Sequence, residues 1–553
     1  MSSTKIGTRR SVRDLQTEYD RGNKKPLEDV IRAWKGIKEL PPSDLNSFFV
    51  LGGYHGEPFE VRKAVDALST TDVYLYWGGW CNHGNVLFPT WHRAYLHRLE
   101  QALQSIVPGV MLPFWDETNE ESLSGGIPSI LTQEKVELDG ELIDNPLHSF
   151  TLPAHLSDDF WADNTSAEKH QYAKPKGYQT VRYPLSGLVG NAIDREATRA
   201  HNAKYPDPVK NTALLNRNVM EWLHHAGPNG LGPNSTDPDP SGVGIYSMFE
   251  ACLRAPNYTV FSNTTSAAAW NRDNTNNATM VVPLEQPHND IHLSVGGFDA
   301  PNLDAPPSSF PHGSGQIAGS NGDMGENNTA ALDPIFFFHH CNIDRVFWLW
   351  QKQHVGRTIC LEILDGYKGT SASDAEGPTT GVAPGTKLDM TTSLAPFEKA
   401  DGMYYTSMDC INIETQLGFT YAPGSLEARS GVPSGGGRKL TVRGIDRALF
   451  EGSFVVRAYA SVKGADGASV EYDLGHHAVL CRRDATRCAN CLTHMEVIAH
   501  FSLDCMPADA GDNAHSWVEI QHRGAGIPVV PAGQSHPAAS LPAGLTINLN
   551  VTA

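Results

Sequence analysis

The sequence lacks long apolar runs and has few cysteines. No segment approaches the roughly eighteen consecutive apolar residues that a membrane-spanning helix needs, so we expect no transmembrane segment. The N-terminal segment has no apolar stretch of the kind found in secretory signals, so we expect a cytoplasmic, intracellular protein. Nine cysteines among 553 residues do not indicate a disulfide scaffold and fit a reducing compartment.

Basic residues are outnumbered. Lys and Arg total 43 against 62 Asp and Glu, which gives a formal net charge of −19. A surface of this sign repels phosphate backbones and anionic lipid, so we expect neither nucleic acid nor membrane as a partner. Hydrophobic residues make up 40% of the chain, which is enough to build a large core, and the length suits two or three domains.

The composition and periodicity of the sequence change near residue 421. Apolar residues at helical spacing predict helices over residues 28–40, 89–107, 211–225 and 333–353, the last with Asp333 as N-cap and Pro334 in the first turn. Residues 422–439 are rich in Gly, Ser and Pro and predict a flexible, protease-sensitive linker. Short β-type runs follow. We therefore expect a mainly α domain with long loops (1–421) and a C-terminal all-β sandwich (440–553).

Several of the 23 histidines form a pattern. His288 and His292 are spaced i, i+4, so on a helix both imidazoles can reach one metal ion. His339 and His340 lie in an apolar helix, where they are either core histidines bonded to backbone carbonyls or metal ligands. Asp344, four residues after His340, could hold an imidazole in one tautomer.

A third group lies near residue 90. His92 falls in the first turn of a predicted helix, His83 in the loop before it, and His55 in a turn between glycines. His97 faces elsewhere on its helix and is expected to be structural. The candidates make two sets of three: His55, His83, His92 and His288, His292, His340. Sites built only from imidazoles suit copper, iron or zinc, and two neighbouring ones favour copper and oxygen chemistry over zinc hydrolysis.

Longer motifs carry a family resemblance. They are SFFVLGGYHGEPF (47–59), CNHGNVLFPTWHRAYL (81–96), LPFWD (112–116), PLEQPHNDIHL (283–293) and NGDMGENNTAALDPIFFFHHCNIDR (321–345), with CANC at 488–491. With these motifs the chain resembles a type-3 copper protein, namely a fungal tyrosinase of the intracellular pro-enzyme kind, most similar to the Aspergillus tyrosinases. The resemblance covers nearly the whole chain.

The resemblance implies two copper ions as cofactor, with O2 as co-substrate. One copper would be held by His55, His83 and His92, and the other by His288, His292 and His340, while His339 packs beside them. Cys81 matches the cysteine of a Cys–His thioether bond to His83. The alternative for Cys81 is a buried free thiol.

The resemblance also implies residues around the coppers. Glu285 and Asn289 would hold a water that helps to deprotonate a phenol, although Glu285 could instead cap or salt-bridge a helix end. The family's gate position falls on Asn327, and Leu293 is a candidate for the pocket wall.

The C-terminal domain of a pro-tyrosinase covers the copper site and inserts a side chain into it. Phe454 and Val479 are the candidates for this plug, although the core is the favoured place for each. Cleavage in the linker would release the domain. Cys488 and Cys491 form a C-x-x-C pair, for which copper loading is favoured over a redox or a buried structural pair.

The implied activity is ortho-hydroxylation of monophenols and oxidation of o-diphenols to o-quinones. The alternatives are an o-diphenol-only catechol oxidase or o-aminophenol oxidase, a hemocyanin-like O2 carrier and, almost excluded by the motifs, a zinc hydrolase. The expected partners are phenolic small molecules such as tyrosine, L-DOPA and catechols. The physiological phenol, a copper donor and a homo-oligomeric state stay open.

Overall fold

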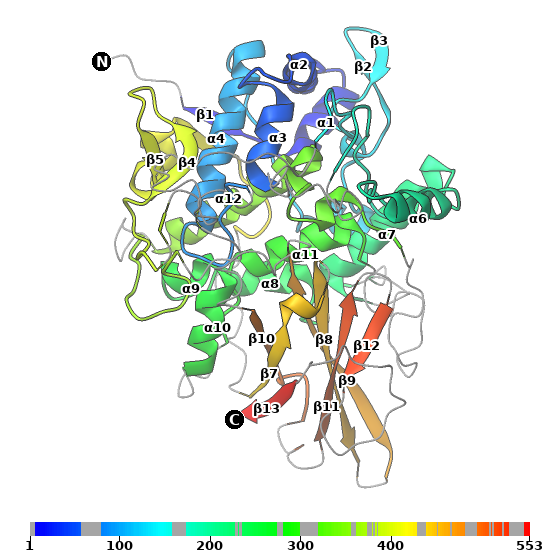
Figure 1. Ribbon diagram of the computed structural model, residues 1–553, viewed down its shortest axis with the longest axis vertical. Coiled ribbons are helices and arrows are strands. Elements are labelled where there is room, and N and C mark those ends of the chain that lie inside the picture. The colour runs from blue at the N-terminus through cyan, green and yellow to red at the C-terminus, as the bar shows by residue number, and fades with distance from the viewer. Residues whose placement is uncertain are drawn as a thin grey trace.

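A computed structural model describes most of the chain. The described residues are 6–56, 79–156, 173–226, 231, 235–239, 241–273, 280–298, 319–354, 361–372, 379, 382–383, 385–427, 438–450, 452–464, 467–481, 495–507, 510, 514–522, 525–529 and 547–552. They form a helical unit and a β unit, and the helical unit lies above the β unit in Figure 1.

The helical unit is built from helices of very different lengths. They are α1 (Val12–Asp20), α2 (Lys25–Glu39), α3 (Phe48–Gly56), α4 (Phe88–Ile106), α5 (Glu120–Gly125), α6 (Ala192–Asn202), α7 (Pro208–His224), α8 (Ile245–Cys252), α9 (Tyr258–Ser262), α10 (Thr264–Asp273), α11 (Glu285–Gly296), α12 (Ile335–His354) and α13 (Ile413–Gln416). Short 3-10 turns lie between its elements: η2 (Ser129–Leu131), η5 (Asp323–Gly325), η6 (Ala330–Leu332) and η7 (Ser407–Cys410); a further turn, η8 (Arg447–Leu449), belongs to the β unit. Among the described residues, none of these helices combines the length and apolarity needed to cross a bilayer.

The four helices expected from apolar periodicity are confirmed as α2, α4, α7 and α12, with ends shifted by a few residues. Prolines in the first turn of α2, α4 and α7 remove an N–H that would have no partner there. Before α12, the Asp333 carboxylate accepts a hydrogen bond from the backbone N–H of Ile335 at 3.1 Å, as an N-cap does. The long helices α4 and α12 are buried along most of their length and cross in the centre of the core.

Small sheets close the helical unit. β1 (Gly7–Arg9) pairs in parallel with β6 (Phe419–Tyr421), so the two ends of the unit meet. β2 (Lys135–Leu138) and β3 (Glu141–Asp144) form an antiparallel hairpin, as do β4 (Ser393–Glu398) and β5 (Tyr404–Thr406).

The β unit contains two antiparallel sheets. One has the strand order β12-β11-β8-β9 and the other β10-β7-β13. The strands are β7 (Lys439–Asp446), β8 (Phe454–Lys463), β9 (Ser469–Val479), β10 (Glu496–Ser502), β11 (Ala514–His522), β12 (Ala525–Val529) and β13 (Asn548–Thr552). Apolar side chains from both sheets share one hydrophobic core, separate from that of the helical unit. The expected helical domain with a C-terminal β sandwich is confirmed.

The two units touch through β9, which packs against α11, and through β10, which lies beside α10. Before the β unit, Ser425 is still bound to the helical unit, since its backbone N–H donates to Asp116 at 2.7 Å. Residues 428–437 of the expected linker lie outside the described residues. The domain boundaries at 421 and 440 therefore stay predictions.

Candidate metal centre

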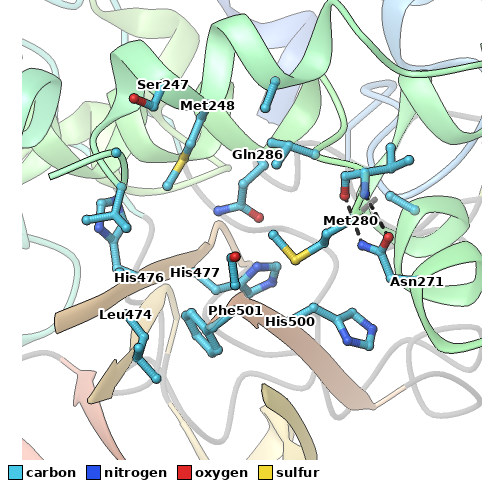
Figure 2. A pocket seen from close by; sticks show the side chains of 18 of the residues that line it. Ser247, Met248, Asn271, Met280, Gln286, Leu474, His476, His477, His500 and Phe501 are labelled. Atoms are coloured by element: carbon cyan, nitrogen blue, oxygen red, sulfur yellow. Dashed lines mark hydrogen bonds between the residues drawn. The ribbon is translucent and has the colours of Figure 1, made fainter. Parts of the chain in front are cut away.

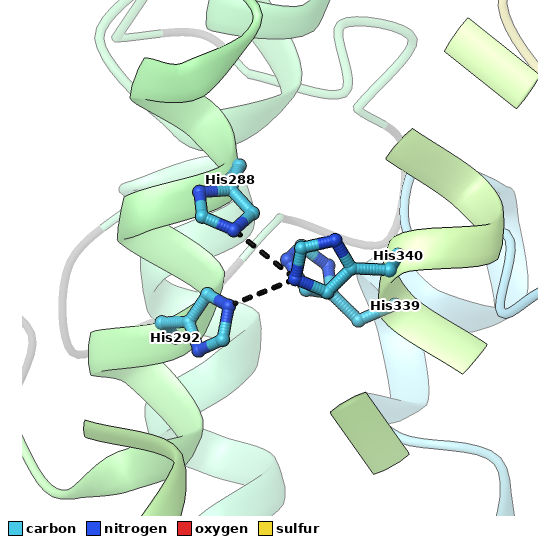
Figure 3. Close-up of side chains that lie close together, drawn as sticks. All are labelled: His288, His292, His339 and His340. Atoms are coloured by element: carbon cyan, nitrogen blue, oxygen red, sulfur yellow. Dashed lines mark hydrogen bonds between the residues drawn. The ribbon is translucent and has the colours of Figure 1, made fainter. Parts of the chain in front are cut away.

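Three histidines from two helices converge on one point. His288 and His292 lie one turn apart on α11, and both aim Nε2 at the Nε2 of His340 on α12 (Figure 3). The Nε2–Nε2 distances are 3.2 Å for His288 and 3.3 Å for His292. Two imidazole nitrogens that share a tetrahedral metal ion at 2.0–2.1 Å lie about 3.3 Å apart. We call these three residues site B.

His55, His83 and His92 form a second group, site A. Their ring centroids are 5.1 to 5.5 Å apart. His55 lies near the C-terminal end of α3, so the expected turn between glycines is wrong, while His83 comes from the loop before α4 and His92 from its first turns, as expected. The two sites are neighbours, because the His92 and His340 rings stack at 4.5 Å.

Backbone carbonyls fix the orientation of the rings. The Nδ1 atoms of His55, His92 and His292 lie 3.0, 2.8 and 2.9 Å from the carbonyl oxygens of Asn327, Phe88 and Met324. A carbonyl can only accept, so Nδ1 carries the proton in each ring. The lone pair is then left on Nε2, the atom that faces the other histidines.

Burial disfavours the charged form of four rings, those of His92, His288, His292 and His340. The pKa of His92 is lowered to about 3, mainly because the ring is desolvated. The pKa values of His288, His292 and His340 are lowered well below the ordinary value, first by burial and then by neighbouring imidazoles. Neutral imidazoles are the form that binds a metal ion. Among the described residues, the buried Nε2 of His92 has no hydrogen-bond partner, as expected for an atom reserved for a metal.

Comparison with known proteins agrees with this geometry. The family model "Common central domain of tyrosinase" matches residues 45–353. The curated tyrosinase HcTyr2 of Hahella sp. is 64% identical over 94% of this chain and 93% of its own. The chain belongs to the tyrosinase family.

Two further relatives support this membership. The tyrosinase of Aspergillus oryzae is 38% identical over 93% of this chain and 91% of its own. A solved tyrosinase from Burkholderia thailandensis is 55% identical, with a TM-score of 0.83 over 99% of this chain and 100% of that one. The likeness to an Aspergillus enzyme is thus real, but the bacterial relatives are more similar, and the expected fungal origin is not confirmed.

The cofactor of a tyrosinase is a pair of copper ions, with O2 as co-substrate. The donor set fits it. Buried donor atoms form three overlapping clusters: His288, His292, His339 and His340; His55, His92 and His340; and His55, Cys81 and His83. The histidines of sites A and B would therefore offer imidazole nitrogens to two adjacent ions, and nitrogen donors of this kind suit copper.

His339 is a fourth histidine beside site B. Its Nδ1 lies 2.6 Å from a carboxylate oxygen of Glu117, and both side chains are fully buried. Burial lowers the pKa of His339 to about 3 and raises the pKa of Glu117 well above its ordinary value, so both shifts favour uncharged partners. The second Glu117 oxygen accepts from Asn342 at 3.2 Å. Glu117 directly follows the LPFWD motif, but the sequence alone did not predict its place beside the metal centre.

Glu285 joins the two sites. Its Oε1 accepts from the backbone N–H of Gly84, next to His83, at 2.7 Å, and its Oε2 accepts from the backbone N–H and hydroxyl of Thr264 at 2.8 and 3.0 Å. The carboxylate therefore holds the site A loop and the start of α10 against the start of α11. Asn289 places its Oδ1 2.9 Å from Nδ1 of His288, which orients that ring.

Cys81 and Asn327 lie together beside site A. The donor atoms of Cys81, His55 and His83 form one tight cluster, so Cys81 is placed for the expected thioether. The side-chain amide of Asn327 donates to the Cys81 sulfur at 3.5 Å, while the backbone carbonyl of Asn327 accepts from His55 Nδ1. Asn327 thus supports site A. Leu293 is fully buried in the core of the helical unit.

Asp344 was expected to hold an imidazole in one tautomer, and it does not. It accepts from Arg93 Nε at 2.5 Å and from the Tyr421 hydroxyl at 2.6 Å, because these stronger donors are closer.

Phe454 and Val479 are cross-strand partners within the core of the β unit, so neither can be the plug while the sheet is formed. Cys488 and Cys491 lie outside the described residues, and their part in copper loading stays a prediction.

Proposed function

We propose that this tyrosinase is a latent enzyme that hydroxylates monophenols at the ortho position and oxidises o-diphenols to o-quinones, with tyrosine and L-DOPA as test substrates. The observation that carries the proposal is that six imidazoles gather in two adjacent groups within overlapping buried donor clusters, with the rings of His92 and His340 stacked between the groups. The copper pair supplies the redox chemistry with O2. The chain supplies fixed ligands in a dry site.

Aromatic side chains exclude water from the two histidine sites. Phe336 packs on the rings of His55 and His340 with centroids 4.7 and 4.0 Å apart, and Phe88 packs on His288 at 4.9 Å. Such contacts exclude water and leave the rings few positions, so the ligand geometry is set before substrate arrives.

Phenol activation is assigned to Glu285 and Asn289. Three donors already bind the Glu285 carboxylate, so we propose that it orders an accepting water and does not itself take the proton. The second candidate function is an o-diphenol-only catechol oxidase. It applies if the Glu285 carboxylate, already bound by three donors, orders no such water, because no group would then activate a monophenol.

Latency is assigned to the β unit. On β9, His476 Nε2 lies 3.2 Å from a carboxylate oxygen of Asp290, which sits between the site B ligands His288 and His292 on α11. A second polar contact joins His225, just after α7, to Asp473 on β9 at 2.9 Å. A unit docked on the ligand helix can restrict access for phenols until cleavage between residues 422 and 439 releases it.

The test is turnover of tyrosine and L-DOPA by the copper-loaded full chain, before and after limited proteolysis. Cleavage should raise the rate with both substrates. Turnover of L-DOPA alone would reduce the function to catechol oxidase. Equal rates before and after verified cleavage would contradict latency, and copper-bound protein that oxidises neither substrate would contradict the oxidase. The intracellular location, a homo-oligomer and a copper donor stay predictions.

A further inference from the structure

A cavity of about 460 Å³ lies between the helical unit and the β unit. Its walls come from α8, α10 and the start of α11 on one side and from β9 and β10 on the other (Figure 2). This volume and this place between two units are typical of sites for small molecules. On α11, His288 and His292 follow Gln286, and none of the six histidines of sites A and B lines the cavity.

The lining of the cavity is mainly apolar. Met248 and Met280 enter from the helical unit, and Leu474 and Phe501 from the β unit. Burial lowers the pKa of two lining imidazoles, His477 to about 3 and His500 to about 4, so both are neutral at neutral pH. Of the lining residues with charged side chains, Arg254 and Asp504 are solvent-exposed, and Glu250 is half-buried and accepts a hydrogen bond from the Tyr246 hydroxyl at 3.1 Å. A charged ligand would therefore lose its hydration without gaining a buried counter-ion.

The Gln286 side chain in the wall has an acceptor atom without a hydrogen-bond partner in the described part of the chain. Gln286 is 5% exposed, and its amide nitrogen donates to Asp290 at 3.1 Å. Its carbonyl oxygen, Oε1, has no hydrogen-bond partner among the described residues. The side chain points into the cavity in Figure 2. A buried acceptor of this kind is unfavourable until a donor binds it.

We propose that this cavity is a second binding site, for an uncharged phenol. The ring would lie between the two methionines and Phe501, and the hydroxyl would donate to Gln286 Oε1. One water molecule could also satisfy Gln286 but would leave most of this volume empty. Because both units form the walls, a bound phenol favours the docked arrangement over the separated one.

The test is NMR on the copper-loaded full chain without O2, which prevents turnover, with 13C-methyl methionine. Met248→Leu and Met280→Leu assign the two reporter signals. p-Cresol should shift both signals to saturation. Toluene, which lacks the hydroxyl, should bind about tenfold more weakly, and p-toluate should not bind. Unmoved signals, or tighter binding of hexan-1-ol than of p-cresol, would overturn the proposal.

Two variants locate the site. Gln286→Met should weaken p-cresol about tenfold and leave the affinity for toluene unchanged, so that the two probes bind alike. This comparison within one variant controls for any change in folding. Met248→Trp should fill the cavity and abolish the response of the Met280 signal. A full p-cresol response in Met248→Trp, or an unchanged preference for p-cresol in Gln286→Met, would contradict the assignment.

Discussion

At the residue scale, Asn289 sets the direction of one site B ligand. Its Oδ1 lies 2.9 Å from His288 Nδ1, which leaves Nε2 for the metal. Asn289→Ala should weaken copper binding at site B 10–100-fold, the usual effect of removing a group that orients a ligand. Competition with a copper chelator measures this affinity. Ser294→Ala is the control, because that buried hydroxyl on α11 bonds to Ile291 O at 2.9 Å. Equal affinities of Asn289→Ala and the parent chain would contradict this role.

Cys81 carries a prediction about covalent chemistry. Its sulfur clusters with His83 and His55 beside site A. Copper loading in air should form the thioether to His83, with loss of two hydrogen atoms. The denatured copper-loaded chain should then react with a thiol reagent at eight of its nine cysteines, and the peptide mass should fall by the mass of two hydrogens. Cys81→Ser should show no such mass change. Nine reactive cysteines after copper loading in air would contradict the prediction.

At the scale of the elements, Asp344 holds α12 to α4 and to the pair β1–β6. It binds Arg93 at 2.5 Å and Arg9 at 3.5 Å, and both arginines are fully buried. Asp344→Asn should lower the free energy of unfolding by about 3–5 kcal/mol, because it leaves buried charge without its partner.

Denaturant unfolding of the copper-free chain measures this loss. The matched control is Asp139→Asn, which removes a carboxylate 64% exposed in its pair with Arg32 at 2.8 Å. That change should stay within about 0.5 kcal/mol. A similar small effect for Asp344→Asn would show that the buried network contributes little.

The same elements show what the sequence could predict. The cores of α2, α4, α7 and α12 followed from apolar periodicity, because each helix buries one face or nearly all of its surface. The helix around His55 was missed, because Gly52, Gly53 and Gly56 indicated a turn. At Gly52 and Gly56 a side chain would strike the backbone of Ala331 and Asn328, so these glycines permit close packing within a helix.

The site was predicted more fully than its surroundings. Both sets of copper-site histidines were recognisable because their motifs are local and long. The carboxylates needed three-dimensional information: Asp344 faces arginines from distant segments, and Glu117 meets His339 across 222 positions of sequence. The pairing of β1 with β6 is equally remote in sequence and has no local signal.

At the scale of the whole molecule, docking of the β unit should depend on pH through His225 and Asp473. The pKa of Asp473 is lowered to about 2 from an ordinary 3.8, with His225 as the chief favourable partner against burial. Its contribution is complete above pH 3.8 and is lost as the pH falls towards 2. The pKa of His225 is raised above 6.5 by Asp473, despite burial, so its contribution is complete below pH 6.5 and is lost as the pH rises through the folded-state value.

His225→Gln should therefore destabilise the chain most between pH 3.8 and 6.5. The difference in free energy of unfolding from the parent chain should shrink at higher and at lower pH. Denaturant titrations of both chains across this range measure it. A difference that does not vary with pH would contradict an ion pair at this interface.

His476 carries the prediction for latency. It is buried on β9, 3.2 Å from Asp290 of the ligand helix. His476→Ala should loosen docking and raise L-DOPA turnover of the uncut chain severalfold, towards the rate of the cleaved enzyme. Glu471→Ala, an exposed change on the same strand, is the control and should have no effect. Unchanged turnover in His476→Ala would show that this contact does not restrict the site.

We expect the six histidines of sites A and B to hold two copper ions. The most direct measurement is the copper content of the full chain, by mass spectrometry of the metal after dialysis, together with that of His92→Ala and His288→Ala. We expect two copper ions per parent chain and loss of copper in each variant, from site A in His92→Ala and from site B in His288→Ala. A parent chain that retains zinc in preference to copper, or variants that keep both copper ions, would contradict it.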